Sequence, residues 1–323
     1  MVKNRWAHYL ILVCAMVLLS FFFPRLMPGS PIARLAGGEA GDLTFVQRER
    51  ILESYDLDKP LGEQFLIFLK NTVTLNWGKS FSKKQPIFDL LKSAIPWTLL
   101  LALSNLILSS IIGTVIGALS AFLRKKRKDI KLVLALMLLG AFPSFWIGMI
   151  LISIFSVQLK WFPLYGAYSL WENKEGFAYL LDVAKHLTLP VITAVITSFS
   201  IFFTASRYSV LSVLKQDYIN MATVRGLPGW KVKTAYVMRN SLIPVFTVFM
   251  TELGFILSGS IVIERLFSYP GIGLLLYDAV SARDYPLMQY VFMITSVMVI
   301  STTFLTDFFA RKIDPAMEIA YEE

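Results

Sequence analysis

Residues 97–123 read WTLLLALSNLILSSIIGTVIGALSAFL, and the cationic run RKKRK follows directly at 124–128. The first stretch contains no charged residue and is longer than the ~20 residues that a helix needs to cross the hydrocarbon core of a bilayer. A single segment in hydrocarbon must be helical, because a helix satisfies its backbone hydrogen bonds internally. The stretch therefore predicts a transmembrane helix that ends at a charged boundary.

Five other apolar stretches have the same character. We expect them to span the membrane at Tyr9–Phe23, Ile130–Phe155, Leu187–Ser206, Leu242–Ile263 and Leu287–Ala310. The composition agrees, since 56% of the residues are hydrophobic, only 16% are charged and the mean hydropathy is +0.61. A soluble domain has about 25% charged residues. The sequence therefore predicts an all-α integral membrane protein with six transmembrane helices.

Lysine and arginine gather in four regions that fall on one side of a six-span protein. These regions are residues 3–5, 124–131, 207–239 and 311–312. Short loops rich in Lys and Arg remain in the cytoplasm, so both termini are expected there. The same effect explains the net charge of +9 without nucleic acid as a partner. Cleavage of the first span as a signal peptide is the alternative, but it would leave one terminus against this charge pattern.

The expected organisation has three parts. They are an N-terminal transmembrane helix (residues 1–27), a small extracytoplasmic cap (28–96) and a transmembrane core (97–323) with a cytoplasmic loop at 207–241. Within the cap, capping residues and apolar spacing predict short helices over Thr44–Tyr55 and Leu61–Leu69. A segment of this size is not an independent enzyme domain.

The sequence shows no catalytic or metal-binding pattern. Gly78-Lys79-Ser80 resembles the end of a phosphate-binding loop, but Val73 occupies the position of the first glycine that such a loop needs. Cys14 is the single cysteine, and His8 lies far from His186 in the chain. We therefore expect no enzymatic activity, no metal site and no cofactor on this chain.

The most informative loop segment is Asp217–Gly226, which reads DYINMATVRG. It combines a short helix-forming stretch, a glycine stop and apolar residues on one side. A helix of this kind lies at the membrane interface or docks in the groove of a partner protein. The plainer alternative is an ordinary surface helix.

Together with other motifs, this segment resembles the permease subunits of binding-protein-dependent ABC importers, in particular the first permease of the dipeptide/oligopeptide branch. The coupling loop of the family reads Glu-Ala-Ala, three residues, then Gly. Ala222 and Gly226 match it, whereas Asn220 and Met221 depart from it. Further matches are Asp217-Tyr218-Ile219, Arg225-Gly226, and the stretches at 26–31, 143–146, 239–244, 264–273, 283–286 and 314–315.

The resemblance implies a multi-pass subunit in the cytoplasmic membrane of a prokaryote, forming half of a path for short peptides. Its implied partners are a second, distinct permease, two ABC ATPases that hold ATP and Mg, an extracytoplasmic solute-binding protein and membrane lipid. The implied ATPase-coupling residues are Asp217, Tyr218, Ile219, Ala222, Arg225 and Gly226, with Tyr218, Ile219 and Ala222 as the docking face. The segment Glu264–Gly273, including Pro270 and Gly271, is expected to form a lip at the outer gate.

Glu252 departs from the family, which more often has Gln there. An ionisable residue at bilayer depth is costly and usually faces a cavity or a partner. We hypothesise that Glu252 faces the path and favours a cationic group on the substrate. A protonated or paired structural glutamate is the alternative.

Other functions also stay open at this point. An importer of the same type could carry oligosaccharides, nickel or metal chelates. A stand-alone secondary carrier is disfavoured because Glu252 is the one ionisable residue deep in an expected span. A membrane-bound enzyme lacks a catalytic constellation.

Overall fold

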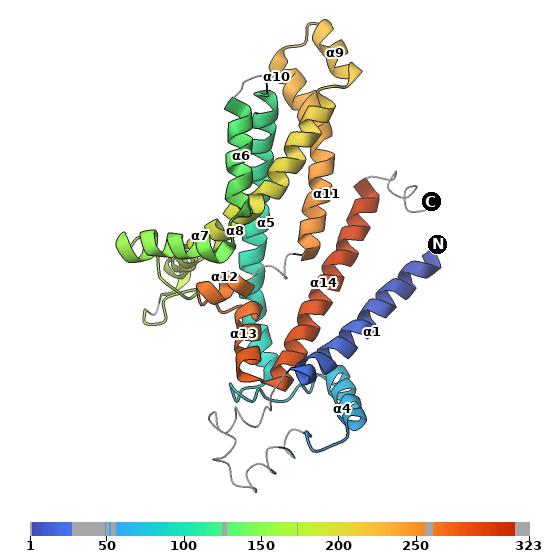
Figure 1. Cartoon of the computed structure of the whole chain (residues 1–323), viewed down its shortest axis with the longest axis vertical. Helices are drawn as coiled ribbons and strands as arrows, with labels where there is room; N and C mark the ends of the chain where they lie inside the picture. Colours follow the sequence, from blue (N-terminus) through green and yellow to red (C-terminus); the bar gives the residue numbers. More distant parts are fainter. Residues whose placement is uncertain are drawn as a thin grey trace. The chain divides into compact units, whose positions relative to one another are not determined.

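The computed structural model describes residues 2–27, 49, 52, 56–124, 128–172, 174–255 and 261–313. Within these ranges the regular elements are helices, apart from an isolated bridge between Lys79 and Pro86 (Figure 1). The chain forms two compact units. The first comprises Met1–Thr98 and Pro270–Ile300, and the second comprises Leu99–Tyr269 and Ser301–Glu323. The all-α class is thus confirmed for the described part of the chain.

In the described part of the chain, four helices are long and apolar enough to cross a membrane. They are α1 (Val2–Leu26), α5 (Ile87–Phe122), α8 (Gly176–Val213) and α14 (Tyr285–Ile313). They contain the first, fourth and sixth predicted spans, and they contain the second except for its last residue, Leu123. Helix α5 begins ten positions before the predicted start, and Pro96 lies inside it. Length and apolar composition therefore support a membrane protein with several spans.

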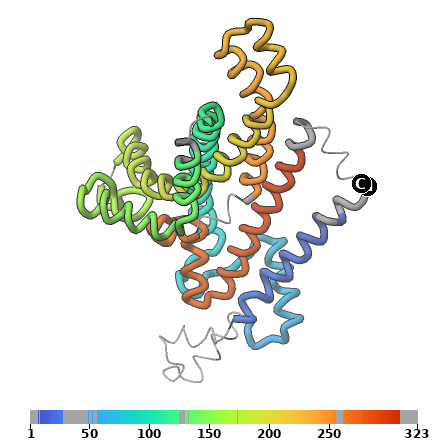
Figure 2. Tube along the Cα trace, turned by 45° about the horizontal axis from the view of Figure 1, so that its top comes forward, coloured from blue at the N-terminus to red at the C-terminus, as the bar shows by residue number. Residues whose placement is uncertain are grey.

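The predicted third span is not one straight helix. Helix α6 (Lys128–Ala141) ends before Pro143, and α7 (Ser144–Leu151) continues into the π-helix η1 (Ile152–Gln158). The two parts are bent by 94° (Figure 2). Proline lacks the backbone N–H that would continue the helix, and it disfavours helical geometry in the residue before it. Counted as one span, this bent pair raises the number of candidate spans to five.

The predicted fifth span, Leu242–Ile263, corresponds only in part to a helix. Helix α11 (Arg239–Phe255) covers the first part of this span. The chain is described again from α12 (Ile261–Leu266), and residues 256–260 lie outside the described residues.

The first unit packs α4 (Leu61–Val73) and α13 (Ile272–Ala282) around an apolar core. Phe21 of α1 is fully buried, and its ring contacts the rings of Phe65 and Phe68 at centroid distances of 5.1 and 5.6 Å. Helix α4 confirms the short helix predicted from residue 61. The other predicted cap helix, over 44–55, falls almost wholly outside the described residues.

Asp284 is the polar centre of this unit, and it is fully buried. Its Oδ2 accepts hydrogen bonds from Ser80 Oγ (2.5 Å), Ser82 Oγ (2.9 Å) and the Ser82 backbone N–H (2.9 Å). Its Oδ1 accepts from the backbone N–H of Leu287 (3.2 Å) in the first turn of α14. One carboxylate therefore caps α14 and holds the loop at 80–82, which gives Ser80 a structural role instead of a phosphate-binding one.

Replacing Asp284 by Asn should destabilise the protein by about 2–3 kcal/mol, because an amide nitrogen cannot accept the hydrogen bonds of these buried donors. Asp278 provides the control, since its ion pair with Lys83 (2.8 Å) is partly exposed. Asp278→Asn should cost no more than about 1 kcal/mol. The measurement is the thermal unfolding midpoint of the detergent-solubilised chain, and equal shifts for the two variants would contradict the central role of Asp284.

In the second unit, α5 and α8 approach each other through two glycines. A Cβ atom placed on Gly113 would lie 2.5 Å from the carbonyl oxygen of Phe199, and one on Gly117 would lie 2.5 Å from that of Phe203. Ser206 Oγ donates a hydrogen bond to the carbonyl of Thr114 across the same contact (2.9 Å). Small residues four positions apart allow helix backbones to pack closely in membranes, where little hydrophobic force drives helices together.

Gly113→Leu should therefore separate α5 from α8 and destabilise the chain by about 1–3 kcal/mol through overpacking. The matched control is Val115→Leu, because Val115 lies on the same helix and is exposed. The thermal midpoint should fall clearly for Gly113→Leu and change little for Val115→Leu. A Gly113→Leu protein as stable as the wild type would show that this contact does not limit packing.

Candidate functional site

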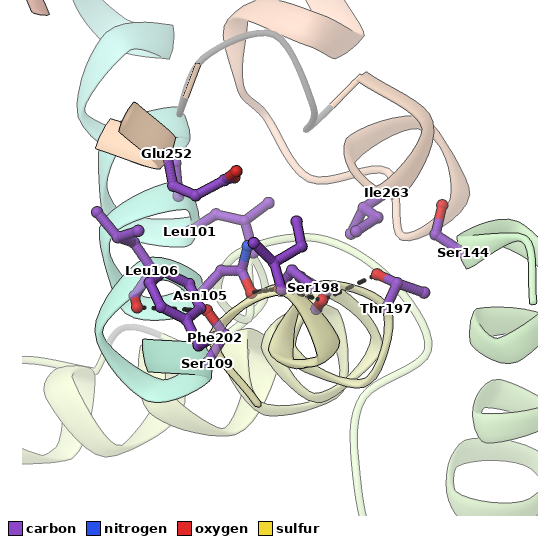
Figure 3. A pocket seen from close by; sticks show the side chains of 13 residues that line it. Leu101, Asn105, Leu106, Ser109, Ser144, Thr197, Ser198, Phe202, Glu252 and Ile263 are labelled. Carbon is purple, nitrogen blue, oxygen red and sulfur yellow. Dashed lines mark hydrogen bonds between the residues drawn. The ribbon is translucent and has the colours of Figure 1, made fainter. Parts of the chain in front are cut away.

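A cavity of about 260 Å³ lies in the second unit, lined mainly by α5 and α8 and also by residues of α7, α11 and α12 (Figure 3). Part of its wall is apolar and includes Leu101, Leu106 and Phe202. The polar part of the wall consists of Asn105, Ser109, Ser144, Thr197, Ser198 and Glu252. A cavity with a few polar groups among apolar ones is typical of small-molecule sites.

Glu252 of α11 lines this cavity and is half-buried. Figure 3 shows it across the cavity from Thr197 and Ser198. Among the described residues, no hydrogen-bond or ion-pair partner is found for its carboxylate. Its place on the cavity wall is compatible with the hypothesis that Glu252 faces a path. That role, and the alternative of a protonated or paired structural glutamate, stay untested predictions.

Asn105 and Ser198 connect the two helices of the cavity wall. Ser198 Oγ lies 2.9 Å from Asn105 Oδ1, which joins α8 to α5. Sequence reasoning missed Asn105, although an amide in an apolar span is itself a signal of a buried polar contact. The hydroxyls of the fourth span divide between two roles: Thr197 and Ser198 reach the cavity, whereas Thr193 is fully buried and bonds the carbonyl of Leu189 (2.8 Å).

The hydroxyls of the last span hold helices together. Thr302 Oγ1 donates to the carbonyl of Gly254 (3.1 Å), and Thr306 Oγ1 donates to that of Met250 (2.7 Å). Both bonds link α14 to α11 within the second unit. Thr302 and Thr303 are absent from the cavity wall.

The loop segment at 217–226 forms the short helix α9 (Asp217–Val224), which follows α8 in Figure 1. Asp217 lies in its first turn, where a negative charge stabilises the helix by interacting with the positive end of the helix dipole. Arg225 is the C-terminal capping residue, and Gly226 has φ +76°. The backbone N–H of Leu227 then bonds the carbonyl of Ala222 (3.3 Å). The glycine stop predicted at the end of this segment is confirmed, and Gly226 adopts the left-handed conformation that glycine favours.

Two residues of the expected docking face point into the chain instead. Ile219 and Ala222 are almost fully buried against Val210 of α8 and Val237 of the π-helix η2 (Val232–Met238), which follows α10 (Gly229–Lys231). The same apolar cluster includes Ala118 and Ala121 of α5. A partner protein cannot reach Ile219 or Ala222, so their part in the expected docking face must be corrected. They anchor α9 to α5, α8 and η2.

The exposed side of α9 carries other residues. Tyr218, Met221 and Val224 are exposed apolar or aromatic side chains at positions i, i+3 and i+6, and Val224 reaches 87% exposure. Tyr218 also keeps a link to the chain, because Asn240 Nδ2 donates to its hydroxyl (3.2 Å). Helical spacing of 3.6 residues places these three on one face, which adjoins the buried face of Ile219 and Ala222.

The expected lip at 264–273 is helical on both sides of a turn. Glu264 is fully buried in α12, where its carbonyl accepts the backbone N–H of Tyr269 (2.8 Å). Pro270, Gly271 and Gly273 belong to the first unit. Gly271 precedes α13, whose first residue Ile272 donates its N–H to Thr98 Oγ1 (2.7 Å).

Comparison with known proteins identifies the kind of chain that carries this cavity and this anchored helix. Residues 113–319 match the family described as binding-protein-dependent transport system inner membrane component. The chain belongs to this family. It is therefore a non-catalytic permease subunit in the inner membrane, and the matched region includes α9 and most of the cavity wall.

Two relatives cover nearly the whole permease. The di/tripeptide transport system permease protein DppB of Pseudomonas aeruginosa (strain UCBPP-PA14) is 33% identical over 304 residues, which is 90% of each chain. The glutathione transport system permease protein GsiC of Escherichia coli (strain K12) is 33% identical over 300 residues, which is 93% of this chain and 92% of the relative. The permease family inferred from the sequence motifs is thus confirmed.

Proposed function

We propose that the permease forms half of the translocation path of an ATP-driven importer for short peptides. The observation that carries the substrate class is the agreement between the two relatives, since one is named for di- and tripeptides and the other for glutathione, which is itself a tripeptide. The proposed organisation has six spans with both termini in the cytoplasm. The bent pair α6–α7 would then supply the third span, and α11 with the residues after it the fifth.

The proposed partners follow from this role. A second, distinct permease completes the path, two ABC ATPases bind ATP and Mg on the cytoplasmic side, and an extracytoplasmic binding protein delivers the substrate. The segment 28–96 forms a cap that helps to receive the binding protein, and residues 264–273 contribute to the outer gate. The cytoplasmic loop 207–241 receives the ATPases.

Helix α9 is the proposed coupling element. Its exposed residues Tyr218, Met221 and Val224 dock in a groove of an ATPase, while Ile219 and Ala222 fix it to the transmembrane helices. A short helix held in this way moves as a rigid body, so closure of the ATPase pair shifts α5 and α8 with it.

Placing a charge on the exposed face of α9 should uncouple the importer without unfolding the permease. Met221→Asp and Val224→Asp should each lower the ATP hydrolysis stimulated by binding protein at least about tenfold in the reconstituted complex, because a buried unpaired charge opposes docking. Copurification of the ATPases should fall in parallel. Gln158→Asp is the control, since it adds the same charge at an exposed position of η1, outside the loop 207–241.

Unchanged stimulation in both α9 variants would refute this docking face. Transport by the chain alone, without ATP, would refute the importer as a whole.

Glu252 is the proposed selective residue of the cavity. Glu252→Gln should lower the uptake of a lysine-containing dipeptide relative to dialanine by about tenfold, because a negative charge in a low-dielectric cavity attracts a cationic side chain. Glu175→Gln is the control, since it removes the same charge from an exposed site outside the cavity. The measurement is competitive uptake into proteoliposomes that contain the whole complex. A preference for the cationic dipeptide that survives Glu252→Gln would eliminate this role.

A further inference from the structure

The first unit contains a cavity of its own, of about 150 Å³. It lies where the last turn of α1, the helix α4, the loop at 77–79 and the first turns of α14 meet. This volume is well below the ~300–1,000 Å³ of pockets for drug-sized molecules. The cavity is therefore sized for a compact group.

Two hydrogen-bond donors on its wall have no partner among the described residues. Trp77 Nε1 and Gln289 Nε2 are buried without a hydrogen bond, in side chains that are 8% and 6% exposed. The Trp77 ring is fixed by stacking on Tyr290, with ring centroids 5.0 Å apart and planes inclined by 13°. Each unpaired buried donor costs about 1–3 kcal/mol. An acceptor atom in the cavity would remove that cost.

A guanidinium group lines the same cavity. Arg25 Nε and Nη2 donate to Gln64 Oε1 (3.2 and 2.8 Å), and Nη1 donates to the carbonyl of Phe21 (2.8 Å). These bonds use three of the five guanidinium N–H groups, and the charge lies 3.6 Å from the centroid of the Phe21 ring. Among the described residues no carboxylate pairs with Arg25. A partly buried cation without an anion is unfavourable, so an anion bound in the cavity would stabilise the Arg25 guanidinium.

Two further charged residues lie on the cavity wall, and together they leave an excess of hydrogen-bond donors there. Lys79 adds a second cation. Asp56 is the carboxylate of the wall, and its Oδ1 is already paired with Lys59 Nζ at 2.8 Å. Two cations and two unpaired N–H groups around one compact space match the chemistry of an oxyanion such as phosphate.

The position of the cavity favours a lipid headgroup over a free anion as the source of this oxyanion. Arg25 lies at the end of α1 and Gln289 near the start of α14, and both helices are candidate membrane spans. The cavity therefore lies at the depth of lipid headgroups. Trp and Tyr are typical of this depth, and a pocket lined by cations and N–H groups beside membrane helices suits an anionic headgroup. Phe22, Phe23 and Leu26 of α1 are exposed nearby and can contact acyl chains. We propose that this cavity binds the phosphate of an anionic phospholipid headgroup.

The test uses the complete importer in nanodiscs of phosphatidylcholine with a small, varied fraction of phosphatidylglycerol. Lipid retained by the permease is counted by native mass spectrometry after release from the disc. Trp77→Phe keeps the ring and removes the N–H, and Arg25→Gln removes the charge. Each should weaken retention of phosphatidylglycerol about tenfold, the loss expected for one hydrogen bond to a charged group. Lys70→Gln is the control, because Lys70 is an exposed cation of α4 that does not line the cavity.

The outcomes separate the possible ligands. Selective retention of phosphatidylglycerol that is weakened by Trp77→Phe and unaffected by Lys70→Gln would support the proposal. Inorganic phosphate added to pure phosphatidylcholine discs tests the free anion. If it raises the thermal midpoint of the wild type but not of Trp77→Phe, while phosphatidylglycerol is not retained, the ligand is free phosphate and the lipid assignment is overturned. Equal retention by the wild type and Trp77→Phe, or equal retention of the two lipids, would overturn the site even if Arg25→Gln fails to fold.

Discussion

The backbone hydrogen bond is the constraint on which this fold depends. Hydrocarbon offers no partner to a peptide N–H or C=O group, so each spanning segment must satisfy its own groups. The long apolar helices α5 and α8 do so over most of their length, with Pro96 and Pro190 as the internal exceptions. The helical hydrogen bonding is interrupted at Pro143, between α6 and α7. The next residue, Ser144, lies on the wall of the polar cavity. Irregular backbone at membrane depth is tolerated in such places because polar groups or water are close.

Little hydrophobic force drives helices together inside a membrane, so these helices depend on close packing and hydrogen bonds. Gly113 and Gly117 bring the backbones of α5 and α8 into contact, and the bond between Asn105 and Ser198 joins the same pair of helices near the cavity. Further along the pair, Ala118, Ala121 and Val210 form the surface that holds α9. One helix pair therefore supports both the cavity and the exposed helix, which gives a direct mechanical connection between them within the second unit.

Periodicity and local motifs in the sequence predicted those structural features that depend only on residues close together in the chain. The apolar run at 97–123 predicted the core of α5, and Gly226 predicted the end of α9. The direction in which α9 faces was not predictable, because Ile219 and Ala222 are buried by residues from three other elements. The bend at Pro143 depends on whether packing tolerates a broken helix, and the proline alone does not settle this. The unpaired donors Trp77 and Gln289 meet only after folding brings positions more than 200 residues apart together, so no local pattern signals them.

Asp284 also determines when the first unit can be completed. Its partner Ser80 precedes it by 204 positions, and most of the second unit is encoded between them. A ribosome delivers the segments around α4 long before the residues of α13 and α14 that bury them. Until the last helix is inserted, Trp77 and Phe81 lack the side chains that cover them in the finished core. A chain truncated after α12 would therefore lack the residues of α13 and α14 that cover Trp77 and Phe81, and this apolar surface would stay exposed.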